Sequence, residues 1–318
     1  MVKMRYVSNA EKIVTPFGTA IALGNFDGVH LGHQKLFEMA MKEKGNLELM
    51  ALSFYPHPTW VLNGVKKDII TSRQHKRALM EKLGVDIFVE YPFTLDLANM
   101  NAYDFFRKIL IENLNAKMII VGQDYKFGKA RQAGIAELES MCKLYNIKLL
   151  VVEKLIWDKE KISSTQIRQY LLDGDIEKAN KLLGYPYKLS GKIIKGNQIG
   201  RTIGFKTANI LTKHGIIYPK NGVYATKVKV YNKDFLAITN IGYNPTINDK
   251  IKIKMVETNI FDFDVEIYDE NIEVSFFKFI RPEKKFESLA DLKRQITSDK
   301  EKTQEYFTNF ARYDILAK

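Results

Sequence analysis

The feature that most constrains the fold of this chain is a change in the pattern of its apolar residues after Pro186. Before that point, short apolar runs alternate with longer stretches of helical periodicity. The runs, which predict strands, cover residues 20–23, 47–54, 86–93, 118–121 and 147–152, and the helical stretches cover 34–44, 72–83 and 102–114. Alternation of this kind is typical of parallel βα units. We therefore expect an α/β domain with a parallel sheet over residues 1–186.

After Pro186 the pattern is that of a β-rich domain. A short helical stretch at 176–183 ends at Gly184, Tyr185 and Pro186, which form a helix-stop and turn signal. The following runs are short and separated by Gly, Asn and Pro; they cover 187–194, 223–230, 235–241, 251–260 and 272–280, and 289–310 predicts a helix. A small antiparallel β-barrel with a C-terminal helix fits residues 187–318 better than a second parallel sheet.

Two domains also agree with the length of the chain. It has 318 residues, close to twice the ~150 residues typical of one domain. The single cysteine, Cys142, cannot form an internal disulfide or a cysteine-rich metal site. No stretch reaches the ~18 consecutive apolar residues of a membrane helix, and no apolar signal core follows Met1. We expect a cytoplasmic protein without a membrane partner, present as a monomer or weak homo-oligomer.

The net charge of +12 raises the question of a nucleic-acid partner. The excess of Lys and Arg over Asp and Glu is shared by both halves of the chain, and there is no basic tail. The densest pattern, Lys250, Lys252 and Lys254 alternating with isoleucine, predicts the solvated face of a strand. We expect attraction to small polyphosphates and no nucleic-acid partner, and we keep a basic nucleic-acid-binding protein as an alternative.

A candidate phosphate site follows the predicted strand at 20–23. The segment from Gly24 to His33 leads into a predicted helix, and open parallel sheets bind ligands at this edge. Helix N-termini attract anions, and glycines let the backbone approach them. His30 and His33 can both face a bound phosphate, which suits chemistry at a nucleotide α-phosphate. The alternatives are a capping feature or a zinc pair that lacks evident further ligands.

Two common nucleotide-binding motifs are absent from the sequence. The glycines at Gly122 and Gly128 have the wrong spacing for a Walker A loop, and Ala130 stands after Lys129 where Ser or Thr is required. The chain also has no Gly-x-Gly-x-x-Gly segment. Neither a P-loop enzyme nor a dinucleotide dehydrogenase is supported.

A second candidate phosphate site lies between residues 191 and 209. Four glycines are spaced along this segment, which permits the turns and close approach that phosphate binding needs. Thr207 and Asn209 flank Ala208, so their oxygens share one face of a strand. An ordinary hairpin turn with a polar strand end is the alternative.

Several motifs together resemble a known family. In the first half they are residues 24–34, 53–58, 121–128 and 162–168, and in the second half 191–209, 222–225, 240–246, 256–258 and 286–289. The first set resembles the adenylyltransferase module of bacterial bifunctional riboflavin kinase/FAD synthetases, in the family order. The second set is similar to their riboflavin kinase module. The resemblance implies a Rossmann-like nucleotidyltransferase domain followed by a kinase barrel.

The resemblance implies roles for residues of the first half. His30 and His33 would be catalytic, binding ATP phosphates and stabilising the transition state. The other residues implied to bind ATP or its phosphates there are Gly24, Phe26, Asp27, Gly28, Ser164, Thr165 and Arg168. His57 and Asp124 would line the flavin site, although a rigid Pro-His-Pro loop is an equal interpretation for His57.

In the second half the resemblance implies a riboflavin kinase site. Glu257 would accept the proton of the riboflavin 5′-hydroxyl. Thr207 and Asn209 would bind Mg²⁺ and, with Gly196 and Gly200, the ATP phosphates. Arg281 would contact the flavin. The implied function is ATP-dependent phosphorylation of riboflavin to FMN, then adenylylation of FMN to FAD with release of pyrophosphate, both with Mg²⁺.

The kinase half departs from the family pattern at three positions. Lys206 stands where the family usually has proline, and Asn259 replaces an aromatic residue or histidine. The segment around Val265 lacks the expected glycines. These changes leave open an FMN adenylyltransferase whose barrel is a degenerate, flavin-sensing domain.

Overall fold

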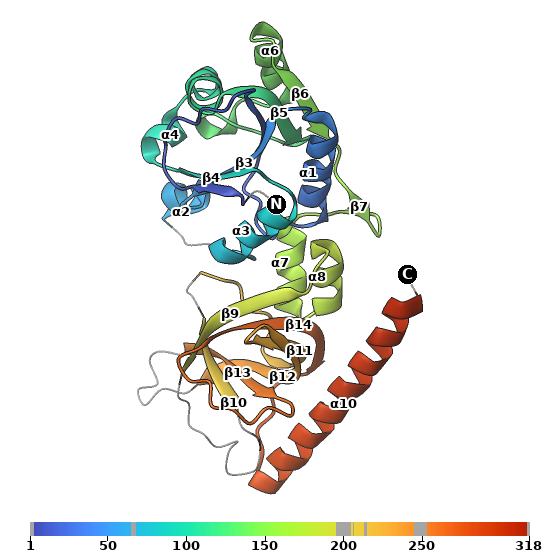
Figure 1. The fold of residues 1–318 in the computed structure, drawn as a ribbon. Coiled ribbons are helices and arrows are strands. Elements are labelled where there is room, and N and C mark those ends of the chain that lie inside the picture. The colour runs from blue at the N-terminus through green and yellow to red at the C-terminus, as the bar shows by residue number, and fades with distance from the viewer. Residues whose placement is uncertain are drawn as a thin grey trace. The chain divides into compact units, whose positions relative to one another are not determined.

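The chain forms two compact units in the computed structural model, Met1–Ser164 and Thr165–Lys318 (Figure 1). The structure describes residues 3–64, 68–194, 205, 207–212, 215–244 and 253–316. Within these ranges, no helix is both long and apolar enough to cross a membrane.

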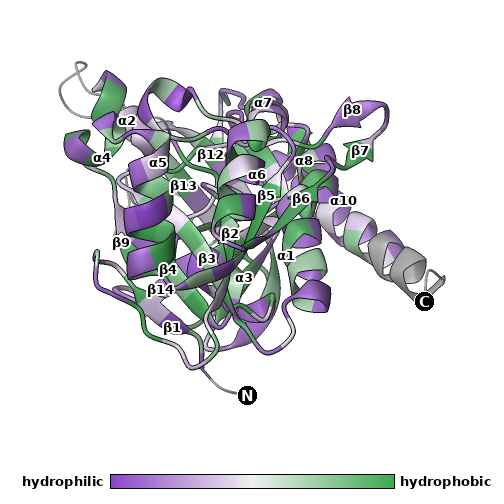
Figure 2. Cartoon of the chain, turned by 90° about the horizontal axis from the view of Figure 1, so that it is seen from above, coloured by the Kyte–Doolittle hydropathy of each residue, from purple (hydrophilic) through white to green (hydrophobic). Residues whose placement is uncertain are grey.

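The first unit is built on a parallel sheet of six strands in the order β1-β4-β3-β2-β5-β6, which confirms the predicted fold class. In chain order the strands are β1 (Arg5–Val7), β2 (Thr19–Leu23), β3 (Glu48–Tyr55), β4 (Ile87–Pro92), β5 (Ala116–Gly122) and β6 (Lys148–Val152). Every residue of β2 is buried, as expected for a central strand covered on both faces. The middle of this sheet is largely green in the hydropathy colouring of Figure 2.

Helices cover both faces of this sheet and bury two apolar clusters. The α-helices are α1 (Leu31–Glu43), α2 (Pro58–Asn63), α3 (Arg73–Lys82), α4 (Leu95–Asn99), α5 (Ala102–Asp104) and α6 (Ile135–Leu144). The unit also has a π-helix, η1 (Phe105–Asn113), and a short 3₁₀ helix, η2 (Lys129–Arg131). A separate hairpin is formed by β7 (Ile156–Trp157) and β8 (Glu160–Lys161). Side chains alternate along β2: Ala22 packs in the cluster with Phe37 of α1, and Ile21 in the cluster with Phe106 of η1.

Two helices of the first unit differ from the sequence prediction. The helix predicted at 34–44 begins at Leu31, because His30 is its N-cap. The helix predicted at 102–114 is α-helical only over Ala102–Asp104 and continues as η1. Its closing hydrogen bond runs from Leu114 N to Ile109 O, five residues back, at 3.0 Å. Apolar periodicity predicts a helix but does not distinguish these two hydrogen-bond patterns.

The second unit contains a closed antiparallel barrel with the strand order β10-β13-β12-β11-β14-β9, as predicted. In chain order the strands are β9 (Tyr187–Ile194), β10 (Thr207–Thr212), β11 (Gly222–Val230), β12 (Lys233–Asn244), β13 (Ile253–Ile260) and β14 (Asn271–Arg281). Inside it, the buried hydroxyl of Thr239 pairs with those of Thr226 and Thr258 at 2.8 and 2.9 Å. These hydrogen bonds satisfy polar groups that cannot reach water.

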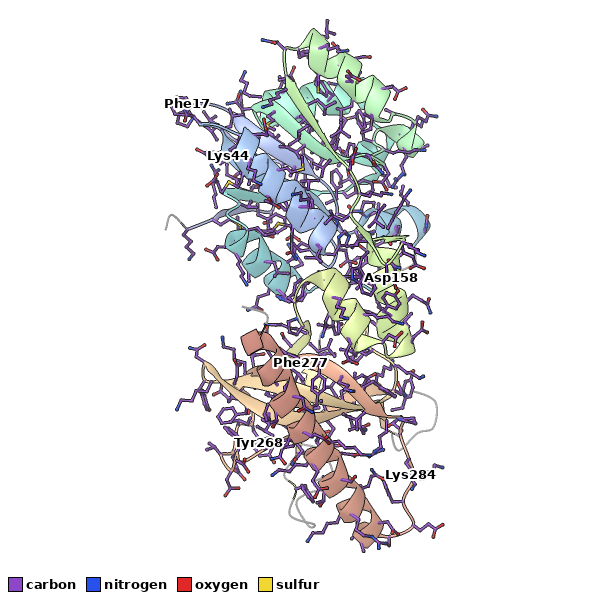
Figure 3. All side chains as sticks on the ribbon, turned by 90° about the vertical axis from the view of Figure 1, so that its right-hand side faces the viewer. Phe17, Lys44, Asp158, Tyr268, Phe277 and Lys284 are labelled. Carbon is purple, nitrogen blue, oxygen red and sulfur yellow. The ribbon has the colours of Figure 1, made fainter. Side chains whose placement is uncertain are left out.

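A long C-terminal helix, α10 (Leu289–Leu316), packs against strands of the barrel. Its Phe307 ring meets the ring of Phe277 on β14 edge to face, with centroids 5.0 Å apart. Figure 3 shows Phe277 on the strand beside this helix. The helix extends beyond the predicted end at residue 310.

Two further helices, α7 (Ser164–Asp173) and α8 (Ile176–Leu183), precede the barrel in the chain. Asn180 of α8 accepts a hydrogen bond from Tyr187 N at 2.7 Å and donates one to Phe276 O at 2.8 Å. The second compact unit begins at Thr165 and so includes α7 from its second residue and all of α8. The domain boundary expected after Pro186 stays a prediction. Gly184, in the left-handed conformation with φ 77°, ends α8, and this helix end does not coincide with the division between the units.

Candidate active sites

The segment after β2 in the first unit is a tight turn with unusual backbone angles. Phe26, Gly28 and Val29 have positive φ values of 49°, 83° and 36°. A Cβ on Gly24 would lie 2.9 Å from the Phe26 ring, so this position accepts only glycine without movement. Phe26 is buried and packs on Phe37 of α1. The predicted site residues Gly24, Phe26 and Gly28 thus shape the backbone of the turn.

Asp27 holds this turn against the segment that precedes α3. Its buried carboxylate accepts hydrogen bonds from Ile70 N at 2.9 Å and Thr71 N at 3.3 Å. Gly28 N donates to the hydroxyl of Thr71 at 2.7 Å, and Ser164 Oγ donates to Asp27 O at 2.8 Å. The structure thus places Ser164 Oγ at the turn and gives the Asp27 carboxylate a structural task, while the implied binding of ATP phosphates by both residues stays a prediction.

His30 and His33 lie together at the start of α1. Their rings stack with centroids 3.6 Å apart and 16° between the planes. His30 Nδ1 accepts a long 3.4 Å hydrogen bond from His33 N, so His30 also caps the helix. His33 N also donates to the backbone carbonyl of His30 at 2.7 Å, so the contact with the ring is the weaker of its two hydrogen bonds. The buried Nδ1 of His33 has no hydrogen-bond partner among the described residues.

Burial keeps both imidazoles neutral at pH 7. It lowers the pKa of His30 to about 4, against the opposing charge of Asp27. The pKa of His33 lies well below its ordinary value because of burial, with smaller contributions from His30 and Lys76. Neutral imidazoles can donate N–H hydrogen bonds to phosphate oxygens without bringing a charge of their own.

The other predicted residues of the adenylyltransferase site are not all placed beside the histidines. His57 Nδ1 caps α2, 3.3 Å from Thr59 N. Asp124 follows β5 and pairs with Lys154 at 2.6 Å. Thr165 and Arg168 belong to the second compact unit. Their contribution to one site with His30 stays a prediction.

Three residues that were assigned no role from the sequence support the turn. They are Ser53 on β3, which begins the motif at 53–58, Thr71 before α3 and Lys76 on α3. The Thr71-Ser72 pair is a helix-start signal that could have drawn attention to this segment. Nothing in the sequence distinguishes Lys76 from the exposed Lys82 of the same helix.

The second site is a pocket of about 360 Å³ in the barrel unit. Its volume lies in the range of small-molecule sites. It collects the predicted residues Thr207, Asn209, Glu257 and Arg281, together with Asn240 and Asn259. Glu257 on β13 stands directly opposite Asn209 on β10 and Asn240 on β12. Thr207 Oγ1 donates a 2.7 Å hydrogen bond to Glu257 Oε1, which leaves Oε2 for another donor.

The oxygen groups around Glu257 fit a Mg²⁺ ion to which water and substrate would supply most of the ligands. Thr207 supplies a hydroxyl and Asn209, with its side chain in the pocket wall, an amide oxygen. Mg²⁺ prefers oxygen ligands and is usually held by few protein groups plus substrate phosphates. Among the described residues, no group of three or more His, Cys, Asp and Glu forms a complete metal site.

Arg281 forms one wall of the same pocket. Its Nε donates hydrogen bonds of 2.9 and 3.1 Å to the two carboxylate oxygens of Asp299 on α10. Asp299 is only 1% exposed. The Cζ atom of Arg281 lies 5.8 Å from the centre of the Phe286 ring. The apolar side chains Leu292 and Ile296 of α10 complete this wall. The C-terminal helix is thus part of the site.

The three departures from the family pattern fall in different places. Asn259 is 9% exposed and lies in the pocket wall, opposite Thr207 in the strand register. Val265 and Thr207 line a smaller cavity of about 70 Å³. Lys206, like the predicted phosphate-binding residues Gly196 and Gly200, lies outside the described residues.

Comparison with known proteins gives matches to both halves. The family model of FAD synthetase matches residues 13–166, and that of riboflavin kinase matches residues 183–307. A "bifunctional riboflavin kinase/FMN adenylyltransferase" of Buchnera aphidicola subsp. Schizaphis graminum is 40% identical, covering 96% of this chain and 98% of its own length. The protein of the same description from Bacillus subtilis is 38% identical, with coverages of 92% and 94%.

One crystal structure is similar over nearly the whole chain. It is described as that of a macrolide-efflux protein from Streptococcus pneumoniae, with a TM-score of 0.86 and 33% identity over 95% of this chain and 99% of that one. Both halves of the chain thus match proteins of flavin-cofactor synthesis in sequence, in the order that the motifs predicted. The chain belongs to the family of bifunctional riboflavin kinases/FMN adenylyltransferases. This confirms the resemblance drawn from the motifs.

Proposed function

We propose that this chain makes FAD from riboflavin in two ATP-dependent steps, one in each compact unit. The observation that carries this proposal is the presence of two separate polar sites: the stacked histidines at the carboxyl edge of the parallel sheet and the Glu257 pocket of the barrel. ATP, riboflavin and FMN are its small-molecule partners. We also propose a cytoplasmic monomer or weak homo-oligomer without nucleic-acid or membrane partners.

The first unit is proposed to carry out adenylyl transfer. A phosphate oxygen of FMN attacks the α-phosphorus of ATP, the bond between the α-phosphorus and the bridging oxygen breaks, and pyrophosphate leaves. No protein nucleophile is needed, so the site has to position the reactants and stabilise charge. His30 and His33, neutral and stacked at a helix N-terminus, supply N–H donors for the phosphate oxygens. Ser164, Thr165 and Arg168 are proposed to hold the polyphosphate.

The barrel is proposed to phosphorylate riboflavin. Glu257 accepts the proton of the riboflavin 5′-hydroxyl while the 5′-oxygen attacks the γ-phosphorus of ATP. The bond from the γ-phosphorus to the bridging oxygen breaks, and ADP leaves. Thr207 holds the Glu257 carboxylate through the 2.7 Å hydrogen bond. Bound Mg²⁺ would neutralise phosphate charge, with Thr207 and Asn209 as its protein ligands. Arg281, fixed by Asp299, is proposed to contact the flavin.

Two parallel incubations test this proposal. Purified protein with Mg²⁺ and ATP receives riboflavin in one and FMN in the other, and flavins are separated by chromatography. The proposal expects FMN and FAD in the first and FAD in the second, and neither product after Mg²⁺ is chelated. FAD from FMN without FMN from riboflavin would establish the degenerate-barrel alternative instead. Absence of both products would overturn the proposal.

A further inference from the structure

Lys76 is a buried cation beside the turn that carries the two histidines. It lies on α3 and is only 9% exposed. Its Nζ donates a 2.9 Å hydrogen bond to the carbonyl oxygen of Asn25, the second residue of the turn. Charged side chains are rarely buried without a specific reason. The positive charge of Lys76 has no part in the catalytic roles proposed for the first unit.

A second buried donor meets the same carbonyl oxygen. Ser53 Oγ on β3 donates to Asn25 O at 3.1 Å. A carbonyl oxygen has two lone pairs, so Ser53 and Lys76 together saturate it. The next residue, Phe26, has φ 49°, a backbone conformation that is unfavourable for a non-glycine residue and persists only when its surroundings hold it. The two donors fix the peptide group that leads into this strained residue.

Holding one carbonyl does not by itself require a cation. Burial lowers the pKa of Lys76, and the carboxylates of Asp27 and Glu90 oppose this. An uncharged donor would avoid the cost of desolvating an ammonium group. The charge of Lys76 also acts on His33, where it adds to burial and to His30 in lowering the pKa. The amine therefore acts at both ends of the turn.

We propose that Lys76 is a positioning residue for adenylyl transfer, which fixes the Asn25 carbonyl so that the turn presents His30 and His33 to the nucleotide phosphates. It acts through the turn and does not touch the reacting atoms. The proposal rests on the adenylyltransferase function proposed for the first unit. It predicts an effect on the rate of the chemical step that exceeds the effect on ATP binding, because a small displacement of positioned groups can cost about 100-fold in rate.

The first test compares Lys76→Met with Lys82→Met, an exposed lysine on the same helix, in the full chain. For Lys76→Met, kcat for FAD formation from FMN should fall about 10- to 100-fold, with KM for ATP changed by less than about 3-fold. FMN formation from riboflavin should be unchanged in both variants, which controls for protein concentration and for the second unit. Lys82→Met should make FAD at the wild-type rate.

The second test uses the shared carbonyl. Because Ser53 and Lys76 donate to the same oxygen, Ser53→Ala and Lys76→Met should not act independently. The fold-loss in kcat of the double variant should be smaller than the product of the two single losses. A merely space-filling role for the lysine stem predicts independent effects that multiply.

Three results would overturn the proposal. The first is that Lys76→Met and Lys82→Met form FAD with the same kcat. The second is that the loss of kcat in the Ser53→Ala, Lys76→Met double variant equals the product of the losses in the two single variants. If Lys76→Met does not fold, Ser53→Ala carries the test: a several-fold fall in kcat supports the proposal, and an unchanged kcat is the third contrary result. Failure of the wild-type chain to make FAD from FMN would instead overturn the proposed function on which it rests.

Discussion

The imidazole rings of His30 and His33 stack at 3.6 Å while the first ring also caps the helix that carries the second. One short segment therefore sets the position of both rings. Burial lowers the pKa of His30 to about 4 and so keeps the ring uncharged at neutral pH. The pair is accordingly prepared to donate hydrogen bonds to a bound polyanion and not to act as a general base.

Replacing His33 by alanine should abolish FAD formation and spare FMN formation. Loss of one preorganised donor to transition-state charge typically costs about 100- to 1,000-fold in kcat. The measurement is FAD produced from FMN and ATP, with FMN produced from riboflavin as the control in the same preparation. Equal loss of both reactions in a folded protein would contradict the assignment of separate sites.

Glu257→Gln should have the opposite effect. The amide oxygen can still accept the hydrogen bond from Thr207, but the side chain can no longer accept a proton from riboflavin. Loss of a positioned general base typically costs about 100- to 10,000-fold. FMN formation should fall accordingly, while FAD formation from supplied FMN stays at the wild-type rate. Wild-type FMN formation by Glu257→Gln would remove Glu257 as the base.

The stability of the first unit should fall in acid partly through His30. The pKa of this histidine is lowered from 6.5 to about 4 in the folded state, so the unfolded state binds more protons between these values. The free energy of unfolding should therefore decrease as pH falls below 6.5, by about 2–3 kcal/mol from this group at pH 4.5. His30→Gln should show a shallower pH dependence in denaturant titrations. Parallel curves for the two proteins would contradict this account.

Asp299→Ala should weaken both the barrel and its substrate site. The change leaves Arg281 without its buried carboxylate partner, and breaking such a pair costs roughly 3–5 kcal/mol. KM for riboflavin should rise because Arg281 lines the pocket. Glu301→Ala, at an exposed position of the same helix, serves as the control and should leave stability and KM unchanged. An Asp299→Ala protein as stable as Glu301→Ala would show that the pair contributes nothing.

The sequence pattern predicted the architecture well because the buried side chains follow the helical repeat in the helices and the alternation of the strands. β2 is buried along its whole length, and the buried side chains of β9 alternate with more exposed ones. The pattern did not show that the second compact unit begins before α8, because the hydrogen bond from Asn180 of α8 to Phe276 O of the barrel is a tertiary contact. It also could not distinguish the π-helix η1 from an α-helix.

The sequence pointed to the candidate site residues more readily than to the residues that support them. His30, His33 and Thr207 stand in glycine-containing segments that suit phosphate binding, and Glu257 was indicated by the family resemblance alone. Lys76 and Asp299 act on these sites through contacts from distant segments, and each looks like an ordinary charged residue of a helix. Such roles depend on tertiary contacts that spacing along the chain does not encode.

The most direct test of the central claim, two independent active sites in one chain, is a mixing experiment with the two inactive variants. Each is incubated with riboflavin, ATP and Mg²⁺, alone and together. His33→Ala alone should produce only FMN and Glu257→Gln alone essentially no product, whereas the mixture should produce FAD from FMN released by the first variant. FAD from either variant alone, or none from a mixture in which FMN accumulates, would contradict the account.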